Sequence, residues 1–270
     1  MNEFFQMMLL PFVTCLILTG IHAYLGFHVI ERQVIFVDLA LAQVAVLGSG
    51  VALLLGYPWD SSSGYWLSLI FTIVGAGIFA LTRFRKQKVP QEAIIGITYA
   101  VSAAMLLIIF SRFGEGDEYV RQSLVGNVLL VSPDEILKIT LIYSIVGILH
   151  FVWRKKFFLI SQNPQEAFRQ GLNVRMWDFI FYGLFGLVVT SSVQLVGVLL
   201  VFSFLVVPPV CAVLLTDQLR LRLILGWGIG FLASVVGISV SYYGDFPTGA
   251  AIVVVFGILI LLIAGIKRLC

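Results

Sequence analysis

The chain has 270 residues, of which 60% are hydrophobic and 11% charged, with a net charge of +3 and a mean hydropathy of +1.05. A soluble domain of this length could not remove so much apolar surface from water, because its surface must be covered by polar groups. The composition therefore excludes a soluble enzyme, a nucleic-acid-binding protein and a disordered chain, and it predicts a protein whose surplus apolar surface faces membrane lipid.

Apolar runs about 20 residues long, the length that crosses a bilayer as one helix, recur along the whole chain. We predict about nine membrane-spanning helices, with eight to ten left open, at residues 7–30, 33–56, 65–82, 93–111, 136–153, 177–192, 194–215, 223–243 and 247–266. Only the polar cluster from Thr190 to Gln194 separates the sixth from the seventh, and the amphipathic stretch 119–132 is expected either to dip into the membrane or to lie along it. The run lengths favour an all-α polytopic membrane protein over a β-barrel, in a single transmembrane domain of residues 1–270.

The loops between these spans differ in charge. One set holds 14 of the 17 basic residues: Arg32, Arg83, Arg85, Lys86, Lys88, Arg154, Lys155, Lys156, Arg169, Arg175, Arg220, Arg222, Lys267 and Arg268. Because cytoplasmic loops are enriched in Lys and Arg, this set is predicted to be cytoplasmic, which places the N-terminus outside and the C-terminus in the cytoplasm. The opposite side is acidic and is expected to attract cations or a basic docking partner, unless it is only the counterpart of this sorting. Its acids are Glu3, Asp60, Glu115, Asp117, Glu118, Asp134, Glu135 and Asp245.

A polar or ionisable group inside a membrane span is costly and is a candidate functional residue. Three such residues, His22, Asp38 and Gln43, are our candidates for a substrate path or a metal contact. The competing interpretation is structural, with a satisfied interhelical hydrogen bond for His22. For Asp38 it is an ion pair with Arg32 or a cap on a backbone group. Asp38 is the only acid that we expect inside the membrane. The remaining histidines are expected at the cytoplasmic interface: His28 and His150.

The loop between the fifth and sixth spans contains an informative polar segment, residues 161–173. Pro164 can open a short helix and Gly171 can end it, while Glu166 falls in the first turn, where the helix dipole favours an acid. We predict a short cytoplasmic helix that another protein could grip, or else an ordinary interfacial helix. The chain contains no GxxxxGKS or GxxxxGKT sequence to hold nucleotide phosphates, so the energy for uphill transport would come from an ion gradient or from another polypeptide.

Several stretches, in chain order, resemble a known family, the membrane permease subunits of bacterial ABC importers for zinc, manganese and iron. These are VIFVDLALAQVAVLG at 34–48, QEAIIGIT at 91–98, EAFRQGL at 166–172, QLVGVLLVFSFLVVPPVCAVLL at 194–215 and SYYGDFPTGA at 241–250. The resemblance implies a non-enzymatic transport subunit of the bacterial plasma (inner) membrane, with one transmembrane permease domain and with ATP hydrolysed by a partner chain.

The resemblance also implies partners and a cargo. A cytoplasmic ATP-binding subunit would dock at residues 161–173, the coupling segment, through Pro164, Glu166, Ala167 and Gly171. A second copy of the chain would complete a homodimer, and an extracytoplasmic solute-binding protein would deliver the cargo to the outer acidic face. The cargo would be a divalent metal ion, with no cofactor bound stably. The acids implicated on the outer face are Glu115, Asp117, Glu118 and Asp245.

The second-helix motif departs from the family pattern Gly-Asp-Ala-x-Ser-His-Ala, whose Asp and His are implicated in handling the metal. Aligned through Gly48, the His position holds Gln43 and the Asp position holds Leu39. An acid is present one place earlier, at Asp38, and one residue of helix corresponds to a rotation of about 100°. The usual ligand pair is therefore absent or rebuilt, with His22 of the neighbouring span as the candidate imidazole. A chelated or non-metal cargo stays open.

Two other functions compete with this interpretation. A self-contained secondary transporter or channel would need an inverted repeat or several buried acids, and an intramembrane enzyme would need paired catalytic groups within the spans. The sequence displays neither feature. Copurification with an ATPase would separate the importer subunit from the secondary transporter.

Overall fold

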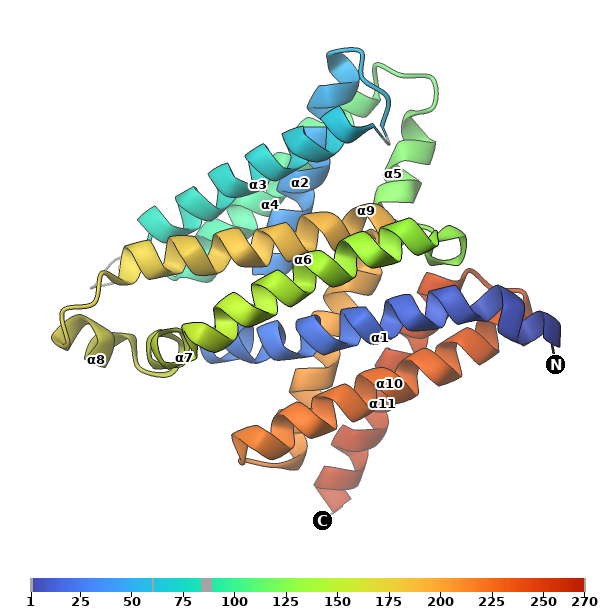
Figure 1. Cartoon of the computed structure of the whole chain (residues 1–270). Helices are drawn as coiled ribbons and strands as arrows, with labels where there is room; N and C mark the ends of the chain where they lie inside the picture. Colours follow the sequence, from blue (N-terminus) through green and yellow to red (C-terminus); the bar gives the residue numbers. More distant parts are fainter. Residues whose placement is uncertain (1, 60, 84–88, 270) are drawn as a thin grey trace.

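The computed structural model describes residues 2–59, 61–83 and 89–269. Asp60 of the predicted outer side and Arg85, Lys86 and Lys88 of the predicted cytoplasmic side lie outside the described residues. Within those ranges the chain is helical with no strand, which confirms the predicted all-α class. The elements, in chain order, are α1 (Asn2–Glu31), α2 (Val37–Leu54), α3 (Ser62–Leu81), α4 (Gln91–Phe110), α5 (Gly116–Val125), the 3₁₀ helix η1 (Val128–Leu130), α6 (Pro133–Val152), α7 (Arg154–Gln162), α8 (Pro164–Arg169), α9 (Val174–Leu215), α10 (Leu219–Gly244) and α11 (Thr248–Leu269) (Figure 1).

Eight helices in the described part of the chain are long and apolar enough to cross a membrane. They are α1, α2, α3, α4, α6, α9, α10 and α11, and they lie close to the predicted spans, so the predicted range of eight to ten is confirmed. Local sequence explains several helix starts. At α6, for example, Ser132 and Glu135 form a reciprocal capping box with Pro133 in the first turn. The side of the membrane on which each terminus lies stays a prediction.

α9 contains both the sixth and the seventh predicted spans. As one straight helix its 42 residues would measure about 63 Å, about twice the hydrocarbon thickness of a bilayer. Gly197, with φ 78° and ψ 163°, is not helical and divides α9 into two legs (Figure 1). The break predicted between Thr190 and Gln194 was placed wrongly. Thr190, Ser191 and Ser192 are buried in continuous helix, because their hydroxyls bond to the neighbouring helices and need no break in the backbone.

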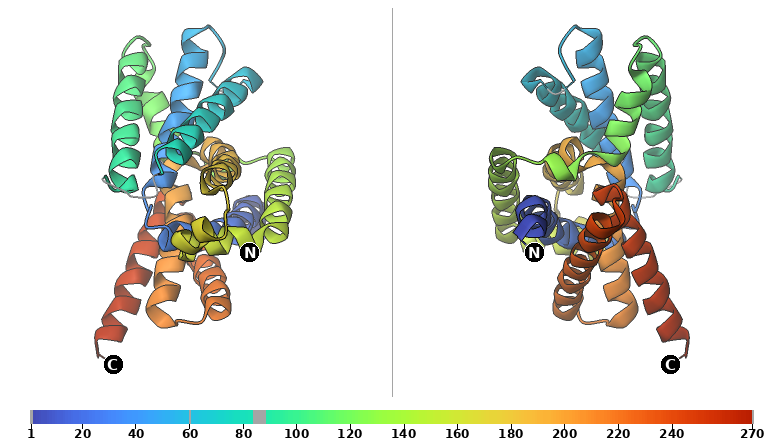
Figure 2. Two further views of the ribbon diagram at one scale, coloured as in Figure 1. Left: turned by 90° about the vertical axis from the view of Figure 1, so that its left-hand side faces the viewer. Right: turned by 90° about the vertical axis from the view of Figure 1, so that its right-hand side faces the viewer.

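α9 is also the central element of the fold. α2, α3 and α4 lie on one side of it and α10 and α11 on the other, while α1 and α6 run beside its first leg (Figures 1 and 2). Small residues allow close approach between helices where lipid supplies no hydrophobic drive. A Cβ built on Gly48 of α2, for example, would come within 2.6 Å of the Cα atom of Ser68 in α3.

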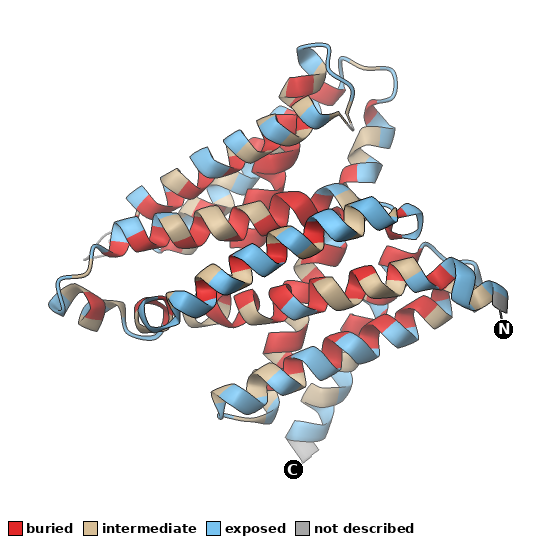
Figure 3. Ribbon diagram, viewed as in Figure 1, coloured by how far each residue is buried: buried red, intermediate tan, exposed pale blue. Residues whose placement is uncertain are grey.

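The outward faces of the peripheral helices are apolar. In α6, the side chains of Leu137, Leu141, Ile145 and Ile148 follow one another at helical spacing, and each is more than half exposed. Buried residues concentrate on the inner faces and along α9, whereas the outer faces of α3, α6 and α10 carry many exposed residues (Figure 3). These apolar stripes are the surplus that the composition assigns to lipid.

The amphipathic stretch 119–132 packs against the protein. α5 contacts α4 and α9, and η1 contacts α1 and α11. The Asn127 N–H donates to the Leu195 carbonyl at 3.2 Å, just before the break in α9. Gly126 and Gly197 meet there so closely that a Cβ on either residue would collide with the backbone around the other. A segment from the loop before α6 therefore braces the bend of the central helix.

Candidate functional site

Asp38 lies in the first turn of α2 and is 0% exposed. Neither of its carboxylate oxygens has a hydrogen-bond partner among the described residues. The suggested ion pair with Arg32 was wrong, because Arg32 pairs with Asp178 instead. An unpaired carboxylate removed from water is costly, and a cation or a proton relieves that cost. The position is therefore chemically suited to receive positive charge.

Gln43, which occupies the histidine position of the motif, is buried in the same helix, and its Oε1 has no partner in the described part of the chain. On a helix, five residues separate two side chains by about 140°, so Gln43 and Asp38 point to different sides of α2. Among the described residues, no three His, Cys, Asp or Glu side chains come together in a set that could hold a metal ion. A transported ion must leave again, so its contacts need not form a stable site.

His22 is buried in α1 and belongs to a chain of hydrogen bonds between helices. Its Nδ1 lies 2.9 Å from the Leu18 carbonyl, which only an N–H can satisfy, so Nε2 carries the lone pair that faces the Ser192 hydroxyl 3.2 Å away. The Tyr143 hydroxyl bonds to Ser192 in turn. The rings of His22 and Tyr143 also pack edge to face, with their centroids 5.9 Å apart. These bonds match the structural interpretation of His22, and its part in a metal path stays a prediction.

Three consecutive hydroxyls of α9 form a polar row across the centre of the fold. Thr190 bonds to Thr72 of α3 at 2.9 Å, Ser191 bonds to Tyr65 of α3 at 3.0 Å, and Ser192 bonds to Tyr143 of α6. Beside this row lies a cavity of about 190 Å³. Sequence reasoning missed the row because each partner is distant along the chain. The residues that line the cavity include Tyr65, Gln122, Glu135, Lys138, Ser191 and Gln194.

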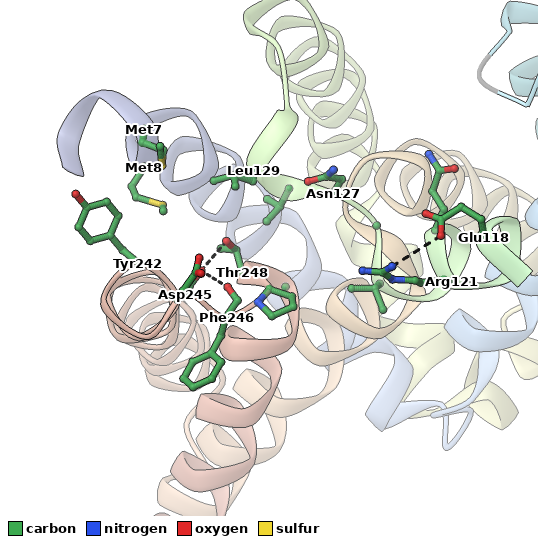
Figure 4. A pocket seen from close by; sticks show the side chains of 17 residues that line it. Met7, Met8, Glu118, Arg121, Asn127, Leu129, Tyr242, Asp245, Phe246 and Thr248 are labelled. Atoms are coloured by element: carbon green, nitrogen blue, oxygen red, sulfur yellow. Dashed lines mark hydrogen bonds and ion pairs between the residues drawn. The ribbon is translucent and has the colours of Figure 1, made fainter. Parts of the chain in front are cut away.

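A second cavity, of about 480 Å³, opens between the start of α1, α5 and the turn from α10 to α11 (Figure 4). Glu118 and Asp245 of the predicted outer acidic face line it, whereas Glu115 and Asp117 lie nearby at the start of α5 without lining it. The Glu118 carboxylate is 3.8 Å from the Arg121 guanidinium, so part of the acidic charge is balanced. The structure thus brings two of the four predicted acids to one cavity.

The coupling segment contains the predicted short helix. The Asn163 side chain accepts the Glu166 N–H at 3.0 Å and caps α8, with Pro164 in the first position. The chain leaves the helix through Gly171, whose φ of 73° is unfavourable for residues with a side chain. Ala167 is fully buried, whereas the Glu166 side chain is 37% exposed. The helix therefore packs against the protein on one face and is partly exposed to solvent on the other. Its docking to a partner stays a prediction.

Behind the coupling segment lies a buried ion cluster that sequence reasoning missed. Arg32 Nη1 is 2.6 Å from Asp178 Oδ1, with both side chains 0% exposed, and Arg83 Nε is 3.2 Å from Asp178 Oδ2. The expectation that Asp38 is the only acid inside a span was therefore wrong. The sequence could have revealed this acid, since Asp178 falls within the predicted span 177–192, between two aromatic residues.

His28 and His150 lie in the last turns of α1 and α6 and are buried, each 1% exposed, while their expected depth at the cytoplasmic interface stays a prediction. The His150 ring stacks on Phe157 of α7 with the ring centroids 4.5 Å apart, and both histidines pack against Phe181 of α9. α7 covers this end of the bundle and removes both imidazoles from solvent.

The arrangement of helices and motifs matches proteins of known family. The model of the ABC 3 transport family matches residues 4–267. The chain belongs to the ABC 3 transport family. This ABC 3 family permease is a multi-pass protein of the bacterial plasma (inner) membrane, and the family resemblance inferred from the sequence is confirmed.

Individual relatives of this ABC 3 family permease agree along nearly the whole chain. It is 26% identical to the manganese transport system membrane protein MntC of Listeria monocytogenes, over 94% of this chain and 87% of the relative. It is 27% identical to the chelated iron transport system membrane protein YfeD of Yersinia pestis, over 94% of this chain and 86% of the relative. Among solved structures, PsaBC from Streptococcus pneumoniae in complex with Fab has a similar fold, with a TM-score of 0.79, 20% identity, and coverage of 97% of this chain and 94% of that one.

Proposed function

We propose that this ABC 3 family permease is the transmembrane subunit of an ATP-driven importer for divalent metal ions, namely zinc, manganese or iron. The observation that carries the proposal is Asp38, a fully buried carboxylate without a hydrogen-bond partner among the described residues. A passing cation would neutralise this group at a point where water cannot. The manganese and chelated-iron relatives support a metal cargo.

The chain itself would break no covalent bond. A cytoplasmic ATP-binding subunit hydrolyses ATP and moves the coupling segment, and two copies of the permease enclose the path as a homodimer. An extracytoplasmic solute-binding protein delivers the ion at the outer acidic face, where Glu118 and Asp245 line one cavity. Closure of the ATP-binding subunits then alternates access to Asp38 between the two sides of the membrane.

Deletion of the gene is expected to lower the cellular content of one metal under metal limitation. Total zinc, manganese and iron would be measured by mass spectrometry in the deletion strain and in strains complemented with the wild type, His22→Ala or Asp38→Ala. The wild type should restore the depleted metal, and a well-expressed Asp38→Ala chain should not. If the content of all three metals is unchanged in a strain without a redundant importer, the proposed cargo is wrong.

Reversing the charge at Glu166 or substituting Pro at Gly171 is expected to uncouple transport from ATP hydrolysis. The reversal alters an exposed side chain, so the fold should persist. Proline fixes φ near −65°, whereas Gly171 has φ 73°, so Gly171→Pro would redirect the chain after α8. In proteoliposomes containing the full complex, the number of ions transported per ATP should fall by about fivefold or more.

Asp217→Arg, a charge reversal at a fully exposed acid in the turn from α9 to α10, is the matched control. Normal coupling in both Glu166→Arg and Gly171→Pro would contradict the docking role.

Gln43 favours a second cargo, a chelated metal. The amide stands where the family motif carries a histidine, and an amide is a weaker ligand than imidazole for a bare transition-metal ion. Competition of uptake between free and chelated forms of the same metal distinguishes the two cargoes. A self-contained secondary transporter would instead accumulate its cargo without an ATPase in the purified complex.

A further inference from the structure

The buried ion cluster joins the ends of three spanning helices. Arg32 follows α1, Arg83 follows α3, and Asp178 lies in the first turns of α9. Two guanidinium groups share one carboxylate, so the position of each helix end depends on the same acid. Arg32 is held from a second direction by the ring of Phe181, whose centroid is 3.8 Å from the guanidinium carbon.

Ser161 connects this cluster to the coupling segment. It is buried in the last turn of α7, three residues before Pro164 opens α8. Arg32 Nε donates to the Ser161 hydroxyl oxygen at 2.9 Å, and His28 Nδ1 lies 2.9 Å from the same oxygen. Arginine can only donate, so the hydroxyl oxygen accepts from Arg32, and its second bond joins it to the His28 ring. One hydroxyl therefore holds α7 to the last turn of α1 by two bonds.

The remaining contacts fix these groups in one arrangement. His28 Nε2 lies 3.1 Å from the Tyr24 hydroxyl, so both ring nitrogens of His28 have a hydrogen-bond partner. Ala167 of α8 is fully buried, and α8 packs on α7 and α9. A buried ion pair is weak grounds for stability, because well-packed apolar residues often serve equally well. Here the contacts hold Arg32, Arg83 and Asp178 in one arrangement. The cluster therefore contributes a defined orientation of α1, α3 and α9 at the point where the coupling segment meets them.

We propose that the cluster of Ser161, Arg32, Asp178 and Arg83 is the mechanical joint that transmits movement of the coupling segment into the spanning helices. A displacement of α8 moves Ser161, which displaces Arg32 and, through Asp178, the first leg of α9. That leg carries the hydroxyl row and ends at the bend at Gly197. These side chains are positioning residues that do not touch the cargo. The inference rests on the proposed function of the coupling segment.

Ser161→Ala tests the joint with little risk to the fold. The full complex, with its ATP-binding subunit and solute-binding protein, would be reconstituted into proteoliposomes, and Mn²⁺ uptake and ATP hydrolysis would be measured on the same sample. We expect at least about fivefold fewer ions per ATP in Ser161→Ala, with ATP hydrolysis retained. The ratio does not depend on the amount of folded protein. Ser203→Ala is the matched control, since Ser203 is buried and its one hydrogen bond among the described residues goes to the Leu199 carbonyl of its own helix.

A second measurement does not depend on the cargo. Gln194→Cys, in a Cys270→Ser background, places a thiol at the exposed end of the first leg of α9, beside the cavity of about 190 Å³. ATP trapping should change the rate of thiol labelling in the wild-type background, and this change should be lost in Ser161→Ala and Asp178→Asn. ATP-dependent labelling without uptake of zinc, manganese or iron would refute the proposed cargo and leave the joint supported. If Ser161→Ala transports as many ions per ATP as the wild type and retains the ATP-dependent change in labelling, the proposed joint is wrong. If Asp178→Asn does not assemble, the result for Ser161→Ala decides by itself.

Discussion

Asp38→Asn is expected to abolish metal transport without destabilising the protein. The carboxylate has no hydrogen bond to lose among the described residues, and its burial imposes a cost on the folded state. A neutral amide of the same shape should leave the free energy of unfolding unchanged or raise it, because it carries no charge to be removed from water. Uptake should fall by at least about tenfold, because a passing cation loses its one buried anionic partner on α2. Thermal unfolding of the purified complex and Mn²⁺, Zn²⁺ and Fe²⁺ uptake in proteoliposomes measure the two effects.

Asp178→Asn is the matched comparison for this prediction. Both acids are fully buried, but Asp178 holds two arginines, so its neutralisation leaves two guanidinium groups without a counterion. Breaking a buried ion pair costs about 3–5 kcal/mol, so this variant should be clearly less stable than the wild type. An Asp38→Asn chain that transports at the wild-type rate would remove Asp38 from the path. An equal loss of stability in the two variants would mean that Asp38 has a structural partner.

The spanning helices could be predicted because the information for them is local. A run of about 20 apolar residues identifies a span wherever it occurs, and α2, α3, α4 and α6 lie close to the predicted ranges. The coupling segment could also be predicted from local sequence, since Pro164 and Gly171 mark the start and end of one short helix. The exception is α9, where a polar cluster suggested a break. Buried hydroxyls do not interrupt a helix when neighbouring helices supply their bonds.

The contacts that define the candidate site depend on residues far apart in the sequence. Arg32 and Asp178 are 146 positions apart, and His22 and Ser192 are 170 apart. No spacing rule connects such pairs. Asp38 could be identified because a charge inside a span is rare, but its lack of a partner could be established only from the packing of every neighbouring helix.

Gly197→Ala is expected to destabilise the protein far more than a methyl group added at Gly56 or at Gly257. With φ 78° and ψ 163°, Gly197 occupies a region open essentially to glycine alone, which costs another residue about 1–3 kcal/mol. The added Cβ would also collide with the backbone around Gly126, which is braced by the hydrogen bond from Asn127 to Leu195. Backbone cannot rotate aside as a flexible side chain can. We therefore expect a loss of more than about 3 kcal/mol, a large share of a typical total stability of about 5–15 kcal/mol.

Two further glycines separate the causes of this loss. Gly257→Ala adds a methyl group in α11 where no atom of the described residues lies within 4 Å, and it should be neutral or slightly stabilising. Gly56→Ala adds a methyl group at φ 87°, again with no neighbour within 4 Å in the described part of the chain, so it carries conformational strain alone. Unfolding of the three purified variants, followed by thermal denaturation, should give the order Gly257→Ala, Gly56→Ala, Gly197→Ala from most to least stable. Equal stability of Gly197→Ala and Gly56→Ala would mean that the loop before α6 yields at Gly126, and that the bend of α9 is not braced from outside.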